Sequence, residues 1–290
     1  MTVNPILIQA QELHGIINDP ALLILDATVQ LPAPRFDGDY QAGSGHDGWL
    51  QAHIPGAVHA DIYASLSDPQ ASFSFALPGA RALAAGLAAL GVSPQRRVVV
   101  YDRADGFWAA RLWWMLRSLG LDAQVLDGGF KAWQRAGLPE QGGNETPQPV
   151  SWTSEFQDGF WIDRLGVQAV LEGERPGTLV CALSAGLFDG SAVTRYARRG
   201  HIPGSLNLPA RELFDEHGFY LHIDVLEAVL DPLLQAPEPL ILYCGGGVSA
   251  AAQALALTLL GRSNVLIYDG SLQEWAADPC LPMTTGAAPA

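Results

Sequence analysis

Short apolar runs and longer helix-forming segments alternate along most of the chain. Four runs of aliphatic and β-branched residues, each bounded by turn formers or polar residues, predict buried strands at 21–27, 96–102, 177–183 and 239–244. Longer segments beside these runs, each of which ends on glycine, predict helices at 80–91, 107–120 and 250–261. Strands that alternate with helices of this length are typical of a mostly parallel α/β sheet that is covered on both faces.

The same series of sequence blocks occurs twice. Tyr101 and Tyr243 lie 142 residues apart, as do Trp133 and Trp275, and each copy also contains an HIPG motif. A repeat of about 145 residues is the size of a whole domain and too long for a solenoid unit. The sequence therefore predicts two homologous domains, residues 1–142 and 155–290, joined at 143–154 by a linker rich in proline, glycine and polar residues.

Composition narrows the classes of protein to consider. The net charge of −14 disfavours binding to nucleic acid or to anionic membranes, because both need a cationic face. The amino terminus lacks the pattern of a signal peptide, and no apolar run approaches the ~20 residues of a membrane helix. Three cysteines without a CxxC pair indicate a reducing cytoplasm. The chain shows no metal-ligand spacing and no nucleotide-binding glycine motif, so neither a metal nor a cofactor is predicted.

Cys244 lies between a predicted strand and a predicted helix. It is followed by Gly245, Gly246, Gly247, Val248 and Ser249. Glycines allow the backbone to turn sharply, so that successive N–H groups point inward, and the helix N-terminus adds a partial positive charge. Such a loop stabilises an anion at its centre, and the thiolate is the nucleophilic form of cysteine. We therefore expect Cys244 to be a catalytic nucleophile within an anion-binding loop formed by residues 245–249, with the helix beginning after Ser249.

With this loop, both HIPG motifs and both Asp-Gly…Trp endings, the chain resembles the tandem-domain rhodanese-type sulfurtransferases. That family comprises the thiosulfate and 3-mercaptopyruvate sulfurtransferases, and the resemblance covers nearly the whole chain. It implies an α/β fold of two tandem rhodanese-like domains, each a small, mostly parallel sheet of about five strands flanked by helices. It also implies an active site between the domains, with the cysteine in the C-terminal copy. The N-terminal copy has Asp102 at the matching position and is degenerate.

The resemblance further implies a double displacement at Cys244. The cysteine takes a sulfur atom from a small-molecule donor, holds it as a persulfide, and passes it to a thiophilic acceptor such as cyanide or a thiol. A thioredoxin-like reductant is a further expected partner. No cofactor, nucleic acid or membrane is implied.

The residues around the loop leave two donors open, 3-mercaptopyruvate and thiosulfate. Gly245 is typical of the mercaptopyruvate type, because thiosulfate-type enzymes usually carry a basic residue there. Three positions depart from the mercaptopyruvate pattern: Gly246 replaces a serine, Phe75 a histidine and Leu187 one of two carboxylate-binding arginines. The resemblance assigns substrate binding to the other arginine, Arg195, and to Asp61 of the acid–base relay. Arg198 or Arg199 is expected to compensate for the missing arginine, and Arg198 is the one assigned to substrate binding.

The remaining candidates have simpler structural explanations. His53 and His201 occur in both copies, including the copy without a cysteine, so we expect them to fix the HIPG turns. Cys181 is expected in the core, and Cys280 in a loop near the C-terminus. Two alternative functions remain: a sulfur carrier or binding module of the same fold with little or no catalytic activity, and a cysteine-dependent phosphatase. The phosphatase is disfavoured because Ala250 occupies the place, six residues after the cysteine, where that chemistry needs an arginine.

Overall fold

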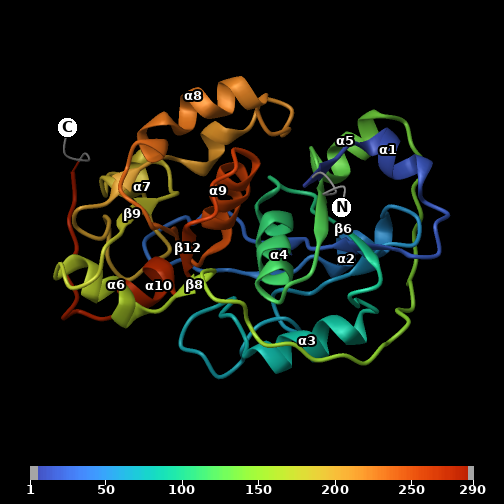
Figure 1. The fold of residues 1–290 in the computed structure, drawn as a ribbon, viewed down its shortest axis with the longest axis horizontal. Helices are drawn as coiled ribbons and strands as arrows, with labels where there is room; N and C mark the ends of the chain where they lie inside the picture. Colours follow the sequence, from blue (N-terminus) through green and yellow to red (C-terminus); the bar gives the residue numbers. More distant parts are fainter. Residues whose placement is uncertain (1–5, 287–290) are drawn as a thin grey trace.

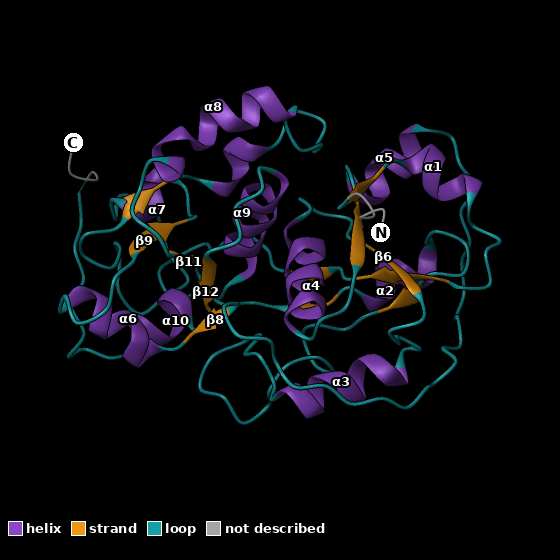
Figure 2. Cartoon of the chain, viewed as in Figure 1, coloured by secondary structure: helices purple, strands orange, loops and turns teal. Residues whose placement is uncertain are grey.

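In the computed structural model, which describes residues 6–286, two parallel five-stranded sheets lie side by side (Figures 1 and 2). The first sheet contains, in spatial order, β1 (Leu7–Ile8), β7 (Ala123–Leu126), β6 (Arg97–Tyr101), β2 (Leu22–Asp26) and β5 (Val58–His59). The second contains β8 (Trp161–Ile162), β12 (Val265–Tyr268), β11 (Leu240–Tyr243), β9 (Thr178–Cys181) and β10 (Leu206–Asn207). When the strands of each sheet are numbered by their order in the sequence, their spatial order is the same in both sheets. The predicted fold of two tandem, mostly parallel sheets is therefore confirmed.

Helices cover both sheets, and one short antiparallel pair lies outside them. The helices of the first half are α1 (Ala10–Gly15), α2 (His46–Gln51), α3 (Ala80–Ala89), α4 (Phe107–Ser118) and α5 (Gly129–Arg135). Those of the second half are α6 (Arg164–Leu171), α7 (Ala185–Phe188), the 3-10 helix η1 (Ala210–Leu213), α8 (Ile223–Leu234), α9 (Val248–Leu259) and α10 (Ser271–Trp275). The antiparallel pair is β3 (Val29–Gln30) with β4 (Gly43–Ser44).

The two halves pack against each other through α4 and α9, which lie side by side in the middle of the molecule (Figure 1). The side chains of α9 are mostly alanine and leucine, and residues 250–257 are all buried. Small side chains allow two helices to approach closely, and a helix that is apolar on every side is stable only where it is covered on every side. Both helices belong to one hydrophobic cluster that is continuous across the two halves. The interface is therefore part of the core.

The residues that connect the two sheets run along the first half. Residues 142–160, which include the predicted linker 143–154, contain no helix or strand. The amide of Val150 donates a hydrogen bond to Ala88 O at the end of α3, and that of Gln157 donates to Ser118 O at the end of α4. Backbone hydrogen bonds of this kind hold an irregular segment against the domain.

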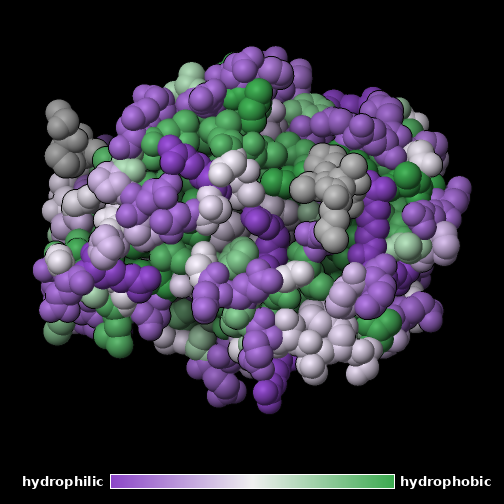
Figure 3. All heavy atoms as spheres, in the orientation of Figure 1, coloured by the Kyte–Doolittle hydropathy of each residue, from purple (hydrophilic) through white to green (hydrophobic). Residues whose placement is uncertain are grey.

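Hydrophilic and apolar side chains are interspersed over the face shown in Figure 3, with apolar atoms gathered around α8 and α9. Two exposed apolar residues of α8, Ile223 and Val225, contribute to the surface. Among residues 6–286, no helix combines the length and the apolar character that crossing a membrane requires.

Candidate active site

Cys244 stands directly after β11, where the chain leaves the carboxyl end of the second sheet. Ligand sites of open α/β sheets lie at this edge. Gly247 has a φ of +70°, a conformation that favours glycine, and it forms the N-cap of α9. The helix begins at Val248, earlier than predicted, because this left-handed glycine completes the turn within three residues of the cysteine. Cys244 is only 2% exposed.

Ser271 holds the cysteine loop in place from α10. Its hydroxyl accepts hydrogen bonds from the amides of Cys244 and Gly247, both at 3.1 Å, and donates one to Tyr268 O at 2.8 Å. Ser271 therefore binds two of the N–H groups of the cysteine loop. Ser271 has a positive φ of 47°, which is uncommon for a residue other than glycine. The sequence did not indicate a role for this residue. Its counterpart in the first half is Gly129, which also has a positive φ.

Cys244 lines a cavity of about 290 Å³ between the two halves. The first half contributes mainly apolar and aromatic side chains, among them Val29, Phe75, Phe107 and Trp108. The second half contributes the cysteine loop, Leu183 and three polar side chains, those of Arg195, Tyr196 and Gln273. Of the predicted loop residues, Gly245, Gly246, Val248 and Ser249 line the cavity, whereas Gly247 turns toward Ser271. A largely apolar cavity with few polar groups is typical of a small-molecule site.

Tyr196 explains why glycine follows the cysteine. A Cβ atom on Gly245 would overlap the Tyr196 hydroxyl and lie 2.5 Å from its Cζ. The phenol therefore occupies the space into which a side chain at this position would project. Burial raises the pKa of Tyr196, and the nearby Cys244 raises it further, so the phenol is neutral. The sequence offered no signal for this residue.

A second hydroxyl, that of Tyr40, faces the same cavity from the first half. It accepts a hydrogen bond from Gln273 Nε2 at 3.0 Å, and Gln273 Oε1 accepts one from the amide of Ser74 at 3.0 Å. Burial raises the pKa of Tyr40 to about 12. Beyond Tyr40, Tyr196 and Gln273 lies an outer hollow of about 610 Å³, whose lining also includes Arg195.

Arg195 is the predicted substrate-binding residue that lines the cavity. Its guanidinium donates hydrogen bonds to Leu31 O at 3.3 Å and to Pro32 O, which ties it to the first half. Its Nε is buried and has no hydrogen-bond partner among the described residues. A buried donor without a partner is costly for stability, so Arg195 is held at the cavity wall at the expense of an unmade hydrogen bond.

The other predicted substrate-binding residues lie elsewhere. Arg198 donates hydrogen bonds to four carbonyls of the C-terminal segment, those of Trp275, Ala276, Asp278 and Leu281, at 2.6–3.0 Å. Asp61 accepts hydrogen bonds from the amides of Tyr63 and Ala64 and caps a turn. Neither residue lines the cavity at Cys244. Leu187 on α7 also lies outside the lining, whereas Phe75 forms part of it and packs against Trp108.

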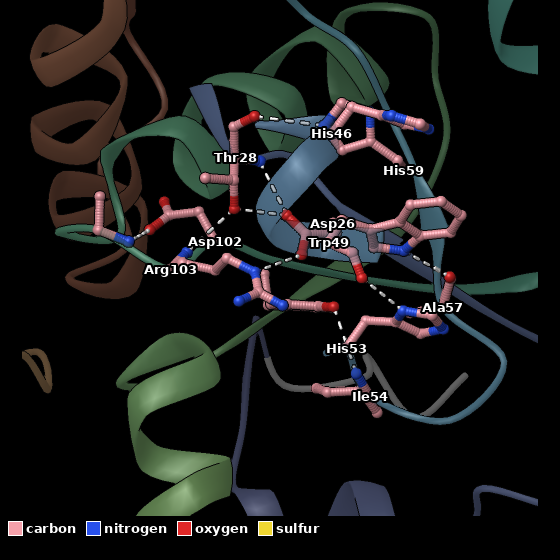
Figure 4. Close-up of polar contacts among 12 residues, drawn as sticks. Asp26, Thr28, His46, Trp49, His53, Ile54, Ala57, His59, Asp102 and Arg103 are labelled. Atoms are coloured by element: carbon pink, nitrogen blue, oxygen red, sulfur yellow. Dashed lines mark hydrogen bonds and ion pairs between the residues drawn. The ribbon is translucent and has the colours of Figure 1, made fainter. Parts of the chain in front are cut away.

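In the first half, Asp102 stands at the place of the cysteine, after β6 (Figure 4). Its carboxylate accepts hydrogen bonds from the amides of Ala104 at 2.8 Å, Gly106 at 3.1 Å and Ala109 at 2.9 Å. These bonds oppose the effect of burial, which raises the pKa of Asp102. The loop of the degenerate copy thus surrounds an acidic side chain at its first position with backbone donors.

The neighbouring polar cluster stabilises this degenerate loop. Arg103 Nε donates to Asp26 at 3.2 Å, and the Arg103 amide donates to Thr28 Oγ1 at 3.1 Å (Figure 4). In the second half, Cys181 occupies the strand position of Asp26, so no such ion pair forms beside Cys244. The side chains of this cluster that hold the degenerate loop therefore come from the same half of the molecule.

Both HIPG histidines fix turns, as expected. A hydrogen bond joins His53 Nδ1 to Trp49 O at 2.7 Å, and another joins His201 Nδ1 to Phe188 O at 2.8 Å. Their rings stack on those of Trp49 and Phe188. Neither histidine lines the cavity at Cys244.

The other two cysteines are also where the sequence predicts them. Cys181 is buried in β9, and burial raises the pKa of its thiol to about 12. Cys280 is exposed near the C-terminus, and all three cysteines are free. Within the described part of the chain, no three His, Cys, Asp or Glu side chains are grouped so that they could hold a metal ion.

Comparisons with known proteins agree with this geometry. The sequence profile described as "Rhodanese-like domain" matches residues 9–136 and 178–278, one segment in each half. The chain is 35% identical over 275 residues to the 3-mercaptopyruvate sulfurtransferase of Escherichia coli, covering 92% of this chain and 93% of that protein. It is 34% identical over 289 residues to the putative thiosulfate sulfurtransferase SseB of Mycobacterium tuberculosis, covering 98% of each. The crystal structure of SseA from Escherichia coli, a 3-mercaptopyruvate sulfotransferase by its description, superposes with a TM-score of 0.78 at 32% identity, covering 92% of this chain and 99% of that one.

Proposed function

Because the chain belongs to the rhodanese-like family of sulfurtransferases, we propose that Cys244 carries sulfur as a persulfide from 3-mercaptopyruvate to a thiophilic acceptor. The family and the sulfurtransferase class, both predicted from the sequence, are confirmed by its relatives. The donor, the persulfide and the acceptor are the proposal.

The observation that carries the proposal is the position of Cys244. The thiol lies at the N-terminus of the 12-residue helix α9 and lines a cavity large enough for a small molecule. A helix N-terminus stabilises negative charge, which favours both the thiolate and the persulfide anion. At the matching position of the first half, the Asp102 side chain likewise accepts hydrogen bonds from three backbone amides, although burial keeps its pKa raised.

The charges around the cavity favour 3-mercaptopyruvate over thiosulfate. Apart from Cys244 itself, Arg195 and Asp105 are the charged side chains among the described residues that line it, and Asp105 pairs with Arg211 at 3.0 Å. Arg195 is therefore the one cation of the lining. A dianion such as thiosulfate would enter with little compensation, whereas a donor with one carboxylate needs only the guanidinium of Arg195. Tyr196 occupies the space that a basic residue after the cysteine would need.

The reaction divides into two displacements. In the first, the Cys244 thiolate attacks the sulfur of 3-mercaptopyruvate, and the electrons of the breaking C–S bond pass to the carbon. The resulting enolate takes the proton of the transferred sulfur and leaves as pyruvate, so Cys244 becomes a persulfide anion. In the second, a nucleophile such as cyanide attacks the outer sulfur, the S–S bond breaks, and thiocyanate leaves while the Cys244 thiolate is restored.

A thiol, including that of a thioredoxin-like reductant, can replace cyanide as the acceptor. It takes the outer sulfur in the same displacement and leaves as a persulfide. The three free cysteines suit a reducing compartment such as the cytoplasm, where such thiols are abundant.

Replacing Arg195 by methionine is expected to raise the KM for 3-mercaptopyruvate by about 10-fold to 100-fold, because a hydrogen bond to a charged group is lost. Thiocyanate formation from each donor with cyanide is the measurement. R195K retains the charge and should recover part of the loss. R198M is the matched control, because Arg198 binds only backbone carbonyls outside the cavity. An unchanged KM in R195M, or a wild-type protein that prefers thiosulfate, would overturn the donor assignment.

A further inference from the structure

Arg111 of α4 is a fully buried cation that the degenerate half places under the cysteine loop. It is 0% exposed, and its Nη2 donates a hydrogen bond to Phe75 O at 3.1 Å and pairs with the carboxylate of Asp269 in the second half. The other oxygen of Asp269 accepts a hydrogen bond from the amide of Leu77 at 2.7 Å. Arg111 and Asp269 therefore join the two halves beside the cavity.

The rest of the guanidinium lies against the loop itself. A Cβ on Gly247 would stand 2.8 Å from Arg111 Nη1, so this nitrogen lies directly beside the glycine that turns the chain into α9. Arg111 Nε and Nη1 are buried and, within residues 6–286, have no hydrogen-bond partner. The guanidinium carbon lies 4.8 Å from the centre of the Trp161 ring.

Burying Arg111 in this arrangement lowers the free energy of unfolding, so a contribution to stability does not explain it. Each buried donor without a partner costs free energy, and one partly exposed carboxylate compensates the charge only in part. A positive charge that is kept dry beside the N-terminus of α9 does, however, act in the same direction as the helix dipole. Both favour a negative charge on the sulfur at the start of the loop.

We propose that Arg111 is a positioning residue for Cys244. From the half that lacks the cysteine, it holds the loop at Gly247 and the cavity wall at Phe75 together, and it supplies the buried cation that favours the anionic sulfur. The inference rests on the proposed function for its catalytic consequence. It also gives the degenerate half a chemical role in the active site.

Few other ionisable groups face Cys244. Arg195 and Asp105 line the cavity with the neutral hydroxyls of Tyr40 and Tyr196, and Cys181 lies on the neighbouring strand β9. Asp269 lies beneath the loop with Arg111. A change in the ionisation of Cys244 on loss of Arg111 can therefore be assigned to Arg111, provided that these groups remain in place.

The test measures the reactivity of Cys244 without any sulfur donor. In a Cys280→Ser background, the rate of alkylation of Cys244 by iodoacetamide is followed by mass against pH, because only the thiolate reacts. We expect Arg111→Met to lower the rate near neutral pH about 10-fold and to move the rise of the profile to higher pH. Arg111→Lys, which retains the charge, should keep the position of the profile. The same variants should show a parallel loss of kcat/KM for sulfur transfer.

Arg117→Met is the matched control. Arg117 also lies on α4 and reaches the second half, but it donates to Thr258 Oγ1 and packs on Trp113, away from the loop. It should leave the alkylation profile unchanged. An Arg111→Met profile that coincides with that of the parent protein, in a variant whose melting curve shows it to be folded, would overturn the inference. If Arg111→Met does not fold, Arg111→Lys provides the test. An alkylation profile of Arg111→Lys that is displaced in pH from that of the parent protein would contradict the charge-based role. Because alkylation needs no donor, failure of sulfur transfer in the wild type would reject the proposed function separately.

Discussion

Cys244→Ser is expected to abolish sulfur transfer, with a loss of at least about 1,000-fold in kcat/KM, because a hydroxyl cannot serve as the sulfur nucleophile at neutral pH. Thiocyanate formation from 3-mercaptopyruvate and cyanide is the measurement. The fold should survive, since serine is close to cysteine in size and the position borders a cavity. The loss would therefore report chemistry and not unfolding.

The other two cysteines provide the controls for this prediction. Cys280→Ser should retain full activity, because Cys280 is exposed near the C-terminus. Cys181→Ala should remain active and lose some stability, because it removes a buried sulfur from β9. Activity that persists in Cys244→Ser and disappears in either control would show that the nucleophile has been assigned to the wrong residue.

Gly245→Ala is expected to produce the second-largest effect. The added Cβ would overlap the Tyr196 hydroxyl, so either the tyrosine or the cysteine loop must move. Forcing an extra methyl group into a packed site costs about 1–3 kcal/mol. A displacement of the nucleophile of about 1 Å is enough to lower the rate about 100-fold. We expect both losses, measured as the melting temperature and as kcat/KM for 3-mercaptopyruvate.

A second substitution tests whether Tyr196 causes the effect. Tyr196→Ala in the Gly245→Ala background removes the overlapping ring and should recover part of the activity relative to Gly245→Ala alone. Gly79→Ala is the matched control, because the space around a Cβ at that position is open. A Gly245→Ala protein as active and as stable as the wild type would show that the space beside the cysteine is not filled as described.

The sequence repeat predicted most of the fold. Tyr101 and Tyr243 occupy the last positions of equivalent central strands, β6 and β11, and pair with equivalent residues of β2 and β9. The repeat predicts the fold because each copy must bury both faces of an equivalent sheet, so the apolar pattern recurs at a constant spacing. The cysteine loop could be predicted for a similar reason, since only a tight glycine turn joins a strand to a helix in so few residues.

The side chains around the loop could not be predicted in the same way. Ser271, Tyr196 and Arg111 reach the cysteine loop from three segments that are distant from one another in the sequence. Tyr196 and Arg111 belong to no motif, and Ser271 stands at an unspecified position within the second Asp-Gly…Trp ending. Arg198 shows the reverse error. It stands three residues before a motif histidine, yet its long side chain turns toward four backbone carbonyls because those acceptors need donors. Proximity to a motif thus gives the place of the backbone and does not determine the direction of a long side chain.

The central claim is that one buried thiol carries the sulfur between the two displacements. Its most direct test is the intact mass of the wild-type protein after incubation with 3-mercaptopyruvate and removal of the excess donor, before and after addition of cyanide. We predict a gain of one sulfur atom, located at Cys244 by peptide fragmentation and lost as thiocyanate when cyanide is added. An unchanged mass with both 3-mercaptopyruvate and thiosulfate, or an added sulfur located at Cys181 or Cys280, would contradict the account.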